Sequence, residues 1–447
     1  MNKHRYQAKE LQRVDWTRLA EDVIGQRLVF SVDVAKEDFY GAFLVSASEA
    51  LITIKWQHPG ETPSLGGYLG ALPATRIEVV LEPSGTYGDS LRGFLRGLGC
   101  EIYLVSPKRV HDAAEVYDGV PSLHDAKAAY LIGRLHLEGA SKPWREAPDR
   151  RREQQALIAE RDLYQGEHCR NLNRLEALLS RHWPELDRIA ELNSSGVLHL
   201  IADYGAPQAV CDHRTQAEAC LHHARRGVAN PTLVTAILDS AAATLGLPCT
   251  AGERHLLQVL AEELLRTRKA LRALERRIAE RVNQDPQLQL LGKSFGKTTA
   301  LVLETTLGSP LDYPDPHAYI KAMGLNLKER SSGQHKGRLK ITKRGSGRAR
   351  HYLFLSAMRF VQRDPVVRAW YRKKVARDGR LPRYNALVAV MRKLGMAIWH
   401  VARGSPFDSR KLFDLKALGM VIRYRLADIL RGRFDLPHRV NIAENSG

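Results

Sequence analysis

The chain has 447 residues, with 68 Lys and Arg against 49 Asp and Glu, so its formal net charge is +19. This length predicts two to four domains, and a hydrophobic fraction of 44% excludes a disordered chain. No apolar run approaches the roughly 20 residues of a membrane span, and the first 26 residues contain no signal-peptide core. Five cysteines without a CxxC pair favour a reducing cytoplasm. The excess positive charge favours a nucleic-acid partner, unless it is only a dispersed, solvated surface.

The N-terminal part predicts a mixed sheet. Residues 27–34, 39–46 and 51–56 are rich in β-forming residues and predict an antiparallel meander. Residues 77–81 and 101–105 are short apolar runs, as expected for buried parallel strands. Helices are predicted at residues 87–98, from Pro107, and at residues 122–137. Three meander strands followed by alternating strands and helices predict an RNase H-like α/β domain.

The middle of the chain predicts long helices. Leu172, Leu175 and Leu179 mark one amphipathic helix. Residues 253–281 carry core positions at spacings of three and four: Leu257, Leu260, Leu264, Thr267, Leu271, Leu274 and Ile278. This pattern predicts an antiparallel helical hairpin or a coiled coil between protomers, and a long helix packed on its own domain would explain it equally.

Two motifs in the helical part only resemble functional sites. Cysteine and histidine alternate at residues 211–213 and 220–223, but C-x-H is not the usual zinc spacing, so ordinary helical residues are the better interpretation. Residues 292–298 end like a P-loop, but they have one residue too few between the glycines and no strand before them. We instead expect Lys293 and Lys297 to contact nucleic-acid phosphate at a helix that opens there.

The C-terminal part contains a concentrated basic segment. Between residues 328 and 350 there is one acid, Glu329, and nine basic residues: Lys328, Arg330, Lys336, Arg338, Lys340, Lys343, Arg344, Arg348 and Arg350. Interspersed glycines predict a mobile loop that brings cations and backbone N–H groups onto phosphates together. A solvated charge run is the alternative.

Three carboxylates are candidates for a metal site. Asp33 lies at the end of the first predicted strand and Glu82 follows the central strand, and these strands are neighbours in an RNase H-like sheet. Asp125 on the following helix is a further candidate. Clustered carboxylates repel one another unless a divalent cation lies between them, so Mg²⁺ or Mn²⁺ and phosphoryl-transfer chemistry are predicted. The alternative is that these are ordinary polar residues at strand ends.

A serine pair lies inside the basic segment. Ser331 and Ser332 precede Gly333. Nearby cations would stabilise the charge that develops when a hydroxyl attacks a phosphodiester. The alternative is a loop serine that hydrogen-bonds its own backbone.

Taken together, these motifs resemble the DEDD transposases of the insertion-sequence one-ten family, including its insertion-sequence eleven-eleven branch. The matching stretches occur in the family's order, at residues 30–36 (FSVDVAK), 81–87 (LEPSGTY), 122–133, 324–333 (GLNLKERSSG) and 341–345 (ITKRG). The resemblance implies a RuvC-like domain, a coiled-coil linker and a C-terminal domain with a serine nucleophile. It also implies insertion and excision of DNA guided by a structured bridge RNA.

Carried over residue by residue, the resemblance makes Asp33, Glu82 and Asp125 the first, second and fourth acids of the DEDD site. Ser332, directly before the glycine, matches the nucleophile, with Ser331 as the alternative. A phosphoserine intermediate would conserve the energy of the DNA bond, so no ATP site is needed.

The third acid is replaced. Its expected position, one helical turn before Asp125, is Ser122. A serine hydroxyl can ligate Mg²⁺ but adds no charge, and Asp118 would reach the site only if Pro121 allows it. We therefore expect weaker metal binding than four acids would give.

The domain organisation predicted is an N-terminal extension (1–26), a RuvC-like domain (27–145), a helical coiled-coil region (146–285), a transposase domain (286–412) and a basic tail (413–447). The predicted partners are donor and target double-stranded DNA, a guide RNA and further copies of the chain, as a dimer or tetramer. A bacterial cytoplasmic enzyme is expected. The alternatives are a RuvC-like hydrolytic nuclease or junction resolvase, and a non-catalytic nucleic-acid-binding protein.

Overall fold

The computed structural model describes residues 7–48, 50–83, 85–223, 230–329, 339–377, 382–415 and 418. The chain divides between Ala147 and Pro148 into two compact units, which are described separately. None of the helices within those described ranges is long and apolar enough to cross a membrane.

The first unit is built on a seven-stranded sheet with the order β1-β4-β3-β2-β5-β6-β7. The strands are β1 (Lys9–Glu10), β2 (Arg27–Asp33), β3 (Asp38–Leu44), β4 (Ile52–Gln57), β5 (Arg76–Leu81), β6 (Glu101–Val105) and β7 (Ser141–Pro143). Strands β2, β3 and β4 form an antiparallel meander, while β5 pairs parallel to both β2 and β6. The predicted meander and the predicted pairing of the first strand with the central strand are confirmed.

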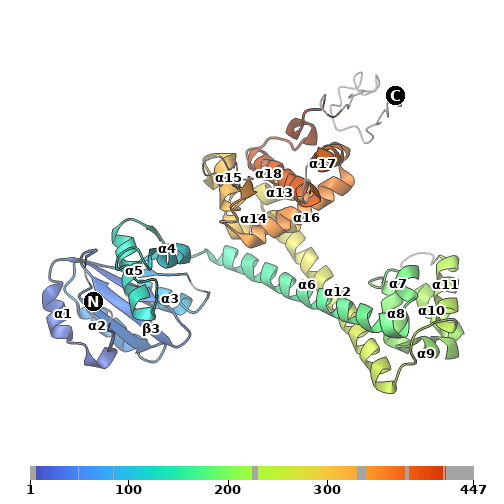
Figure 1. Cartoon of the computed structure of the whole chain (residues 1–447), viewed down its shortest axis with the longest axis horizontal. Helices are drawn as coiled ribbons and strands as arrows, with labels where there is room; N and C mark the ends of the chain where they lie inside the picture. Colours follow the sequence, from blue (N-terminus) through green and yellow to red (C-terminus); the bar gives the residue numbers. More distant parts are fainter. Residues whose placement is uncertain are drawn as a thin grey trace. The chain divides into compact units, whose positions relative to one another are not determined.

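Helices cover both faces of this sheet (Figure 1). They are α1 (Trp16–Asp22), α2 (Thr62–Ala71), α3 (Asp89–Gly97), α4 (Pro107–Ala113) and α5 (Asp125–Leu137). Because side chains alternate along a strand, Phe30 and Val32 pack in one core with α1, α2 and α3, while Val29 packs in the other with α4 and α5. Asp33, two residues beyond Ser31 on β2, therefore belongs to the α5 face.

The first residues belong to the sheet unit. A 3₁₀ helix (Leu11–Arg13) and α1 follow β1, which pairs with β4. Leu11 and Leu19 are buried in the same core as β2. Residues 7–26, which were predicted to lie in an N-terminal extension, therefore pack on the sheet through Leu11, Val14, Leu19 and Val23.

Two long helices organise the second unit: α6 (Asp149–His182, 34 residues) and α12 (Ala251–Asn283, 33 residues). They lie against each other in Figure 1. The pairs Arg281–Glu153 (2.8 Å) and Arg277–Glu160 (3.1 Å) show that they run antiparallel within one chain. Of the alternatives left open by the heptads, the structure therefore shows the helical hairpin.

The polar core position of α12 has a partner on α6. The Thr267 hydroxyl is buried and lies 3.0 Å from Nδ1 of His168, which is also buried. The hydroxyl donates to the helix backbone at Glu263 O (2.9 Å), which is one turn back. A buried hydroxyl is tolerated here because it is hydrogen-bonded.

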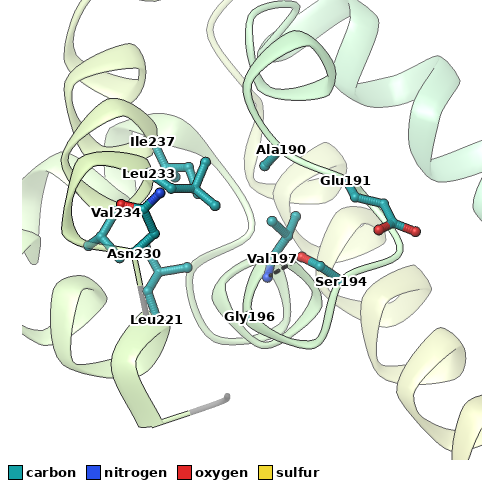
Figure 2. A pocket seen from close by; sticks show the side chains of 10 residues that line it. All are labelled: Ala190, Glu191, Ser194, Gly196, Val197, Leu221, Asn230, Leu233, Val234 and Ile237. Carbon is teal, nitrogen blue, oxygen red and sulfur yellow. Dashed lines mark hydrogen bonds between the residues drawn. The ribbon is translucent and has the colours of Figure 1, made fainter. Parts of the chain in front are cut away.

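Five short helices pack on the far part of α6 and α12. They are α7 (Leu186–Ile189), α8 (Ser195–Tyr204), α9 (Pro207–Asp212), α10 (Arg214–His223) and α11 (Pro231–Ala242). Their common core includes Leu175 and Leu179 of α6, as the spacing predicts. Figure 2 shows a small, largely apolar cavity between α8 and α11. Two polar groups in it, Ser194 and Asn230, cap the starts of these helices, so the cavity presents little chemistry.

The histidines of the Cys/His stretches have ordinary helical partners. His213 and His223 lie 3.1 and 2.8 Å from the backbone oxygens of Ala209 and Ala219, four residues earlier. Cys220 donates its thiol to Asp203 (3.3 Å).

The remaining helices form a separate core around α18 (Pro382–Ala402). The other elements are α13 (Pro286–Phe295), α14 (Lys297–Leu307), a 3₁₀ helix (Pro310–Asp312), α15 (Pro316–Ala322), β8 (Leu327–Lys328), β9 (Lys340–Ile341), α16 (Gly347–Arg363), α17 (Pro365–Arg377) and a 3₁₀ helix (Ser409–Leu412). The P-loop-like residues join α13 to α14 through Gly296, whose φ is +94°, and a helix does open at Lys297. Most of the predicted basic tail lies outside the described residues.

Candidate functional site

Two carboxylates lie at adjacent strand ends. In the parallel β2–β5 ladder Val32 pairs with Leu81, so Asp33 and Glu82 occupy the next position of each strand. Neighbouring strands lie about 4.8 Å apart, and residues in register point to the same face. The two acids predicted to be neighbours therefore are neighbours.

Helix α5 brings a third carboxylate to the same edge. The buried Ser31 hydroxyl of β2 donates to Ala129 O of α5 (2.7 Å), so the helix backbone lies directly on the strand. Asp125 lies one helical turn before Ala129, and Asp33 lies two residues after Ser31. The length from Ala129 to Asp125 along the helix is similar to the length from Ser31 to Asp33 along the strand, because a helical turn rises about 5.4 Å and two strand residues about 6.6 Å.

Small residues allow this close contact. A Cβ at Gly133 would lie 2.7 Å from the Ser31 hydroxyl and 2.5 Å from a methyl group of Leu44. Ala126, Ala128 and Ala129 are likewise buried. A larger residue at 133 would push α5, and Asp125 with it, away from the sheet.

The charges of the three acids act on one another. Burial, followed by the charges of the Asp125 and Glu82 carboxylates, raises the pKa of Asp33 to about 6, although a hydrogen bond from the Val34 backbone N–H lowers it slightly. Asp33 is therefore a carboxylate that gains from a nearby cation at neutral pH.

The position of the expected third acid is not on the helix. Helix α5 begins at Asp125, with the extended residue His124 as its N-cap, so the prediction of a helix from residue 122 is wrong. Pro121 and the capping side chain of His124, which accepts from the Lys127 N–H, explain the later start. Ser122 is exposed in the preceding loop and is not one helical turn behind Asp125.

Asp118, the alternative third acid, has another partner. Its carboxylate accepts a hydrogen bond from the buried ammonium of Lys127 (2.9 Å) and from the Val120 N–H (3.0 Å). It is not among the charges that raise the pKa of Asp33. This geometry makes Asp118 a structural anchor of the loop before α5.

The three carboxylates fit a magnesium ion by chemical type. Mg²⁺ prefers oxygen ligands and is commonly held by one or two carboxylates, with water and substrate phosphate completing its octahedron. Across the described part of the chain, no three His, Cys, Asp or Glu side chains stand close enough to form a ready-made metal cage. An open site of Asp33, Glu82 and Asp125 that closes around ion and phosphate together is consistent with both statements.

The serine pair lies between two short strands. Ser331 and Ser332 lie outside the described residues, as do Arg330, Lys336 and Arg338. On either side, β8 and β9 pair antiparallel, with Lys328 opposite Lys340. Like charges facing each other across a ladder are unfavourable, and a bound anion would relieve that repulsion.

Glycines clamp the base of this segment, which sequence reasoning missed. A Cβ at Gly345 would lie 2.3 Å from Ala322 O and 2.5 Å from Gly324 N. Lys343 N–H donates to Gly324 O, and Thr342 N–H donates to Asn326 O (both 2.9 Å). The signal was present at Gly324, which opens the GLNLKERSSG stretch, and at Gly345, which closes the ITKRG stretch, because these two glycines meet here.

The other predicted cations have mixed surroundings. Lys293 and Lys297 are exposed around the start of α14, and Lys343 and Arg344 are exposed after β9. Some are held by the fold instead: Arg348 pairs with Asp162 of α6 (3.1 Å), and Arg350 donates to Met323 O and Gly345 O (both 2.9 Å).

The sheet order, with acids at the ends of β2 and β5, is consistent with an RNase H-like DEDD enzyme. Residues 30–184 match the family model of a DEDD transposase, DEDD_Tnp_IS110, and residues 292–372 match the transposase IS116/IS110/IS902 family. The insertion element IS110 uncharacterized 43.6 kDa protein of Streptomyces coelicolor is 23% identical over 390 residues, covering 85% of this chain and 95% of that protein.

The chain thus belongs to the IS110 family of transposases, and it is an enzyme that acts on DNA. DEDD transposases typically use a divalent metal ion. The first match spans the three carboxylates, and the second spans the glycine clamp and both sides of the serine pair.

Proposed function

We propose that this transposase cuts and joins the DNA strands of an insertion sequence through a phosphoserine intermediate, with Asp33, Glu82 and Asp125 as its metal ligands and Ser332 as its nucleophile. The observation that carries the proposal is the convergence of the three carboxylates where β2, β5 and α5 meet. Their mutual repulsion at Asp33 is the electrostatic condition that a divalent cation relieves.

Bound Mg²⁺ (or Mn²⁺) would act as a Lewis acid on the scissile phosphate. Asp33 holds a proton at low pH and must release it before it can serve as a ligand. Ser122, in the third position, adds no charge, so we propose that the site binds metal more weakly than a four-acid site.

The covalent step is a transesterification. The Ser332 oxygen attacks phosphorus and loses its proton, the bond from phosphorus to the 3′ oxygen breaks, and that oxygen takes up a proton. A 3′ hydroxyl on a second strand then reverses the step, so the strands are exchanged without net hydrolysis. Lys328 and Lys340, which flank the serine segment, support this assignment because exposed cations there would stabilise the phosphate charge.

We further propose that a structured bridge RNA selects the DNA sites, as the resemblance to the insertion-sequence one-ten family implies. Base pairing would then supply sequence specificity while the protein reads backbone and shape. The proposal includes assembly as a dimer or tetramer on donor and target DNA, in the bacterial cytoplasm.

The test uses the full chain with its element's RNA, Mg²⁺ and a labelled duplex. We expect a protein–DNA adduct that survives denaturation in the wild type and in the matched Ser331→Ala variant, and none in Ser332→Ala. An adduct in Ser332→Ala would contradict the nucleophile assignment. Cleavage without any adduct would indicate the hydrolytic nuclease. The guide-RNA proposal would be contradicted if no RNA copurified with the protein and added RNA had no effect.

A further inference from the structure

A basic groove lies where α8 packs on α12, far along the chain from the carboxylates. It has a volume of about 1030 Å³ and is open to solvent. Helix α8 contributes Ser195 and His199, and α12 contributes the rest of the lining between Leu265 and Ala279. We call it the α12 groove.

The α12 groove is strongly positive. Its lining contains five Lys or Arg residues of α12 and one acid, Glu275. The cations are Arg266, Arg268, Lys269, Arg272 and Arg276. Residues 269, 272 and 276 follow one another at spacings of three and four, so they form one stripe along the helix. This stripe lies beside the face that α12 uses for its core.

Three of these cations are not neutralised. Lys269, Arg272 and Arg276 are exposed and form no ion pair with another described residue. By contrast, Arg266 pairs with Glu263, and Arg268 is half-buried and donates to a backbone oxygen. Burial and the neighbouring Arg272 lower the pKa of Arg268, and the Glu191 carboxylate offsets this only in part.

We propose that the α12 groove binds the phosphate backbone of double-stranded DNA, as a site separate from the carboxylates and the serine segment. From Arg268 to Arg276 the helix rises about 12 Å, a length over which duplex DNA carries about seven phosphates. The lining contains no Trp, Tyr or Phe, and a site for unpaired bases would use such residues for stacking. This inference rests on the proposed function in one respect only, namely that duplex DNA is the substrate.

The test compares two variants of the full chain with the same change in net charge. Lys269→Gln/Arg272→Gln removes two free cations of the groove. Arg170→Gln/Arg174→Gln removes two exposed cations of α6 that are not among the residues lining the α12 groove. Binding to a duplex of about 30 base pairs of unrelated sequence is measured in EDTA, between about 50 and 200 mM salt.

We expect the groove variant to bind DNA about tenfold more weakly, with a salt slope lower by about two, and the α6 variant to match the wild type. Equal losses in both variants would overturn the site, because only net charge would then matter. Tighter, groove-dependent binding of an RNA duplex of the same sequence would overturn the choice of DNA.

Adduct formation distinguishes a failure of the groove proposal from a failure of the proposed function. The groove variant should still form the serine adduct at saturating DNA, while Asp33→Asn should bind DNA normally and form none. If Ser332→Ala still forms the adduct while the groove variant binds DNA more weakly than the α6 variant, the proposed function is refuted and the groove assignment stands.

Discussion

Asp33→Asn should stabilise the first unit at neutral pH in the absence of metal. Folding raises the pKa of Asp33 from 3.8 to about 6, which corresponds to about 3 kcal/mol of unfavourable free energy once the group is ionised. Asp33 is only partly buried, so solvent screening reduces this to about 1–2 kcal/mol. Asparagine has nearly the same shape and no charge, so the variant escapes this penalty.

The sign of the effect depends on pH. Because the folded-state pKa of Asp33 is raised, its stabilising contribution is fully present below pH 3.8 and is lost as the pH rises through about 6. The two proteins should therefore differ little near pH 4 and most above pH 7. Hydrogen exchange of β2 and β5 in EDTA measures this difference for the first unit alone.

Metal should reverse the ranking, because only the wild type would be stabilised by binding, by about 2.7 kcal/mol at a hundredfold excess over Kd. An Asp33→Asn protein that is less stable than the wild type in EDTA at pH 8 would refute the reasoning.

Three further substitutions test the surroundings of the two sites. Ser122→Asp should lower the Mg²⁺ concentration for half-maximal DNA cleavage, with Ser122→Asn as its control; an unchanged requirement would show that the loop keeps residue 122 away. Lys127→Met should destabilise the first unit by about 2 kcal/mol in urea unfolding, because it leaves the Asp118 carboxylate without its buried ammonium partner. Gly345→Ala should cost about 2 kcal/mol, since its φ of +154° is unfavourable for alanine and the new Cβ would meet Ala322 O at 2.3 Å; thermal unfolding that leaves the second unit unchanged would contradict the clamp.

The strand order could be predicted because it depends on local composition and general topology. Residues 27–34 and 77–81 are apolar runs with an acid just beyond or near the end, and parallel neighbours bring such ends together. The predicted antiparallel hairpin was one of several alternatives, because heptads fix the spacing of core residues and leave open which helix covers them. The paired charges and the buried Thr267–His168 contact between α6 and α12 decide this.

The start of α5 could not be predicted from the family pattern. The resemblance places residue 122 on a helix with Asp125, but Pro121 and the His124 cap delay the helix by three residues. The role of Asp118 was hidden for a similar reason, since its partner Lys127 is buried only after α5 packs on the sheet. Short-range sequence patterns do not report such tertiary pairs.

Both proposed sites lie beside a close approach of two backbones that only a small residue permits. Gly133 lets α5 lie on β2, which sets how far Asp125 extends toward Asp33. Gly324 and Gly345 meet where the chain enters and leaves the serine segment. Substitutions at these glycines should therefore reduce adduct formation even under conditions where the variants remain folded and bind DNA.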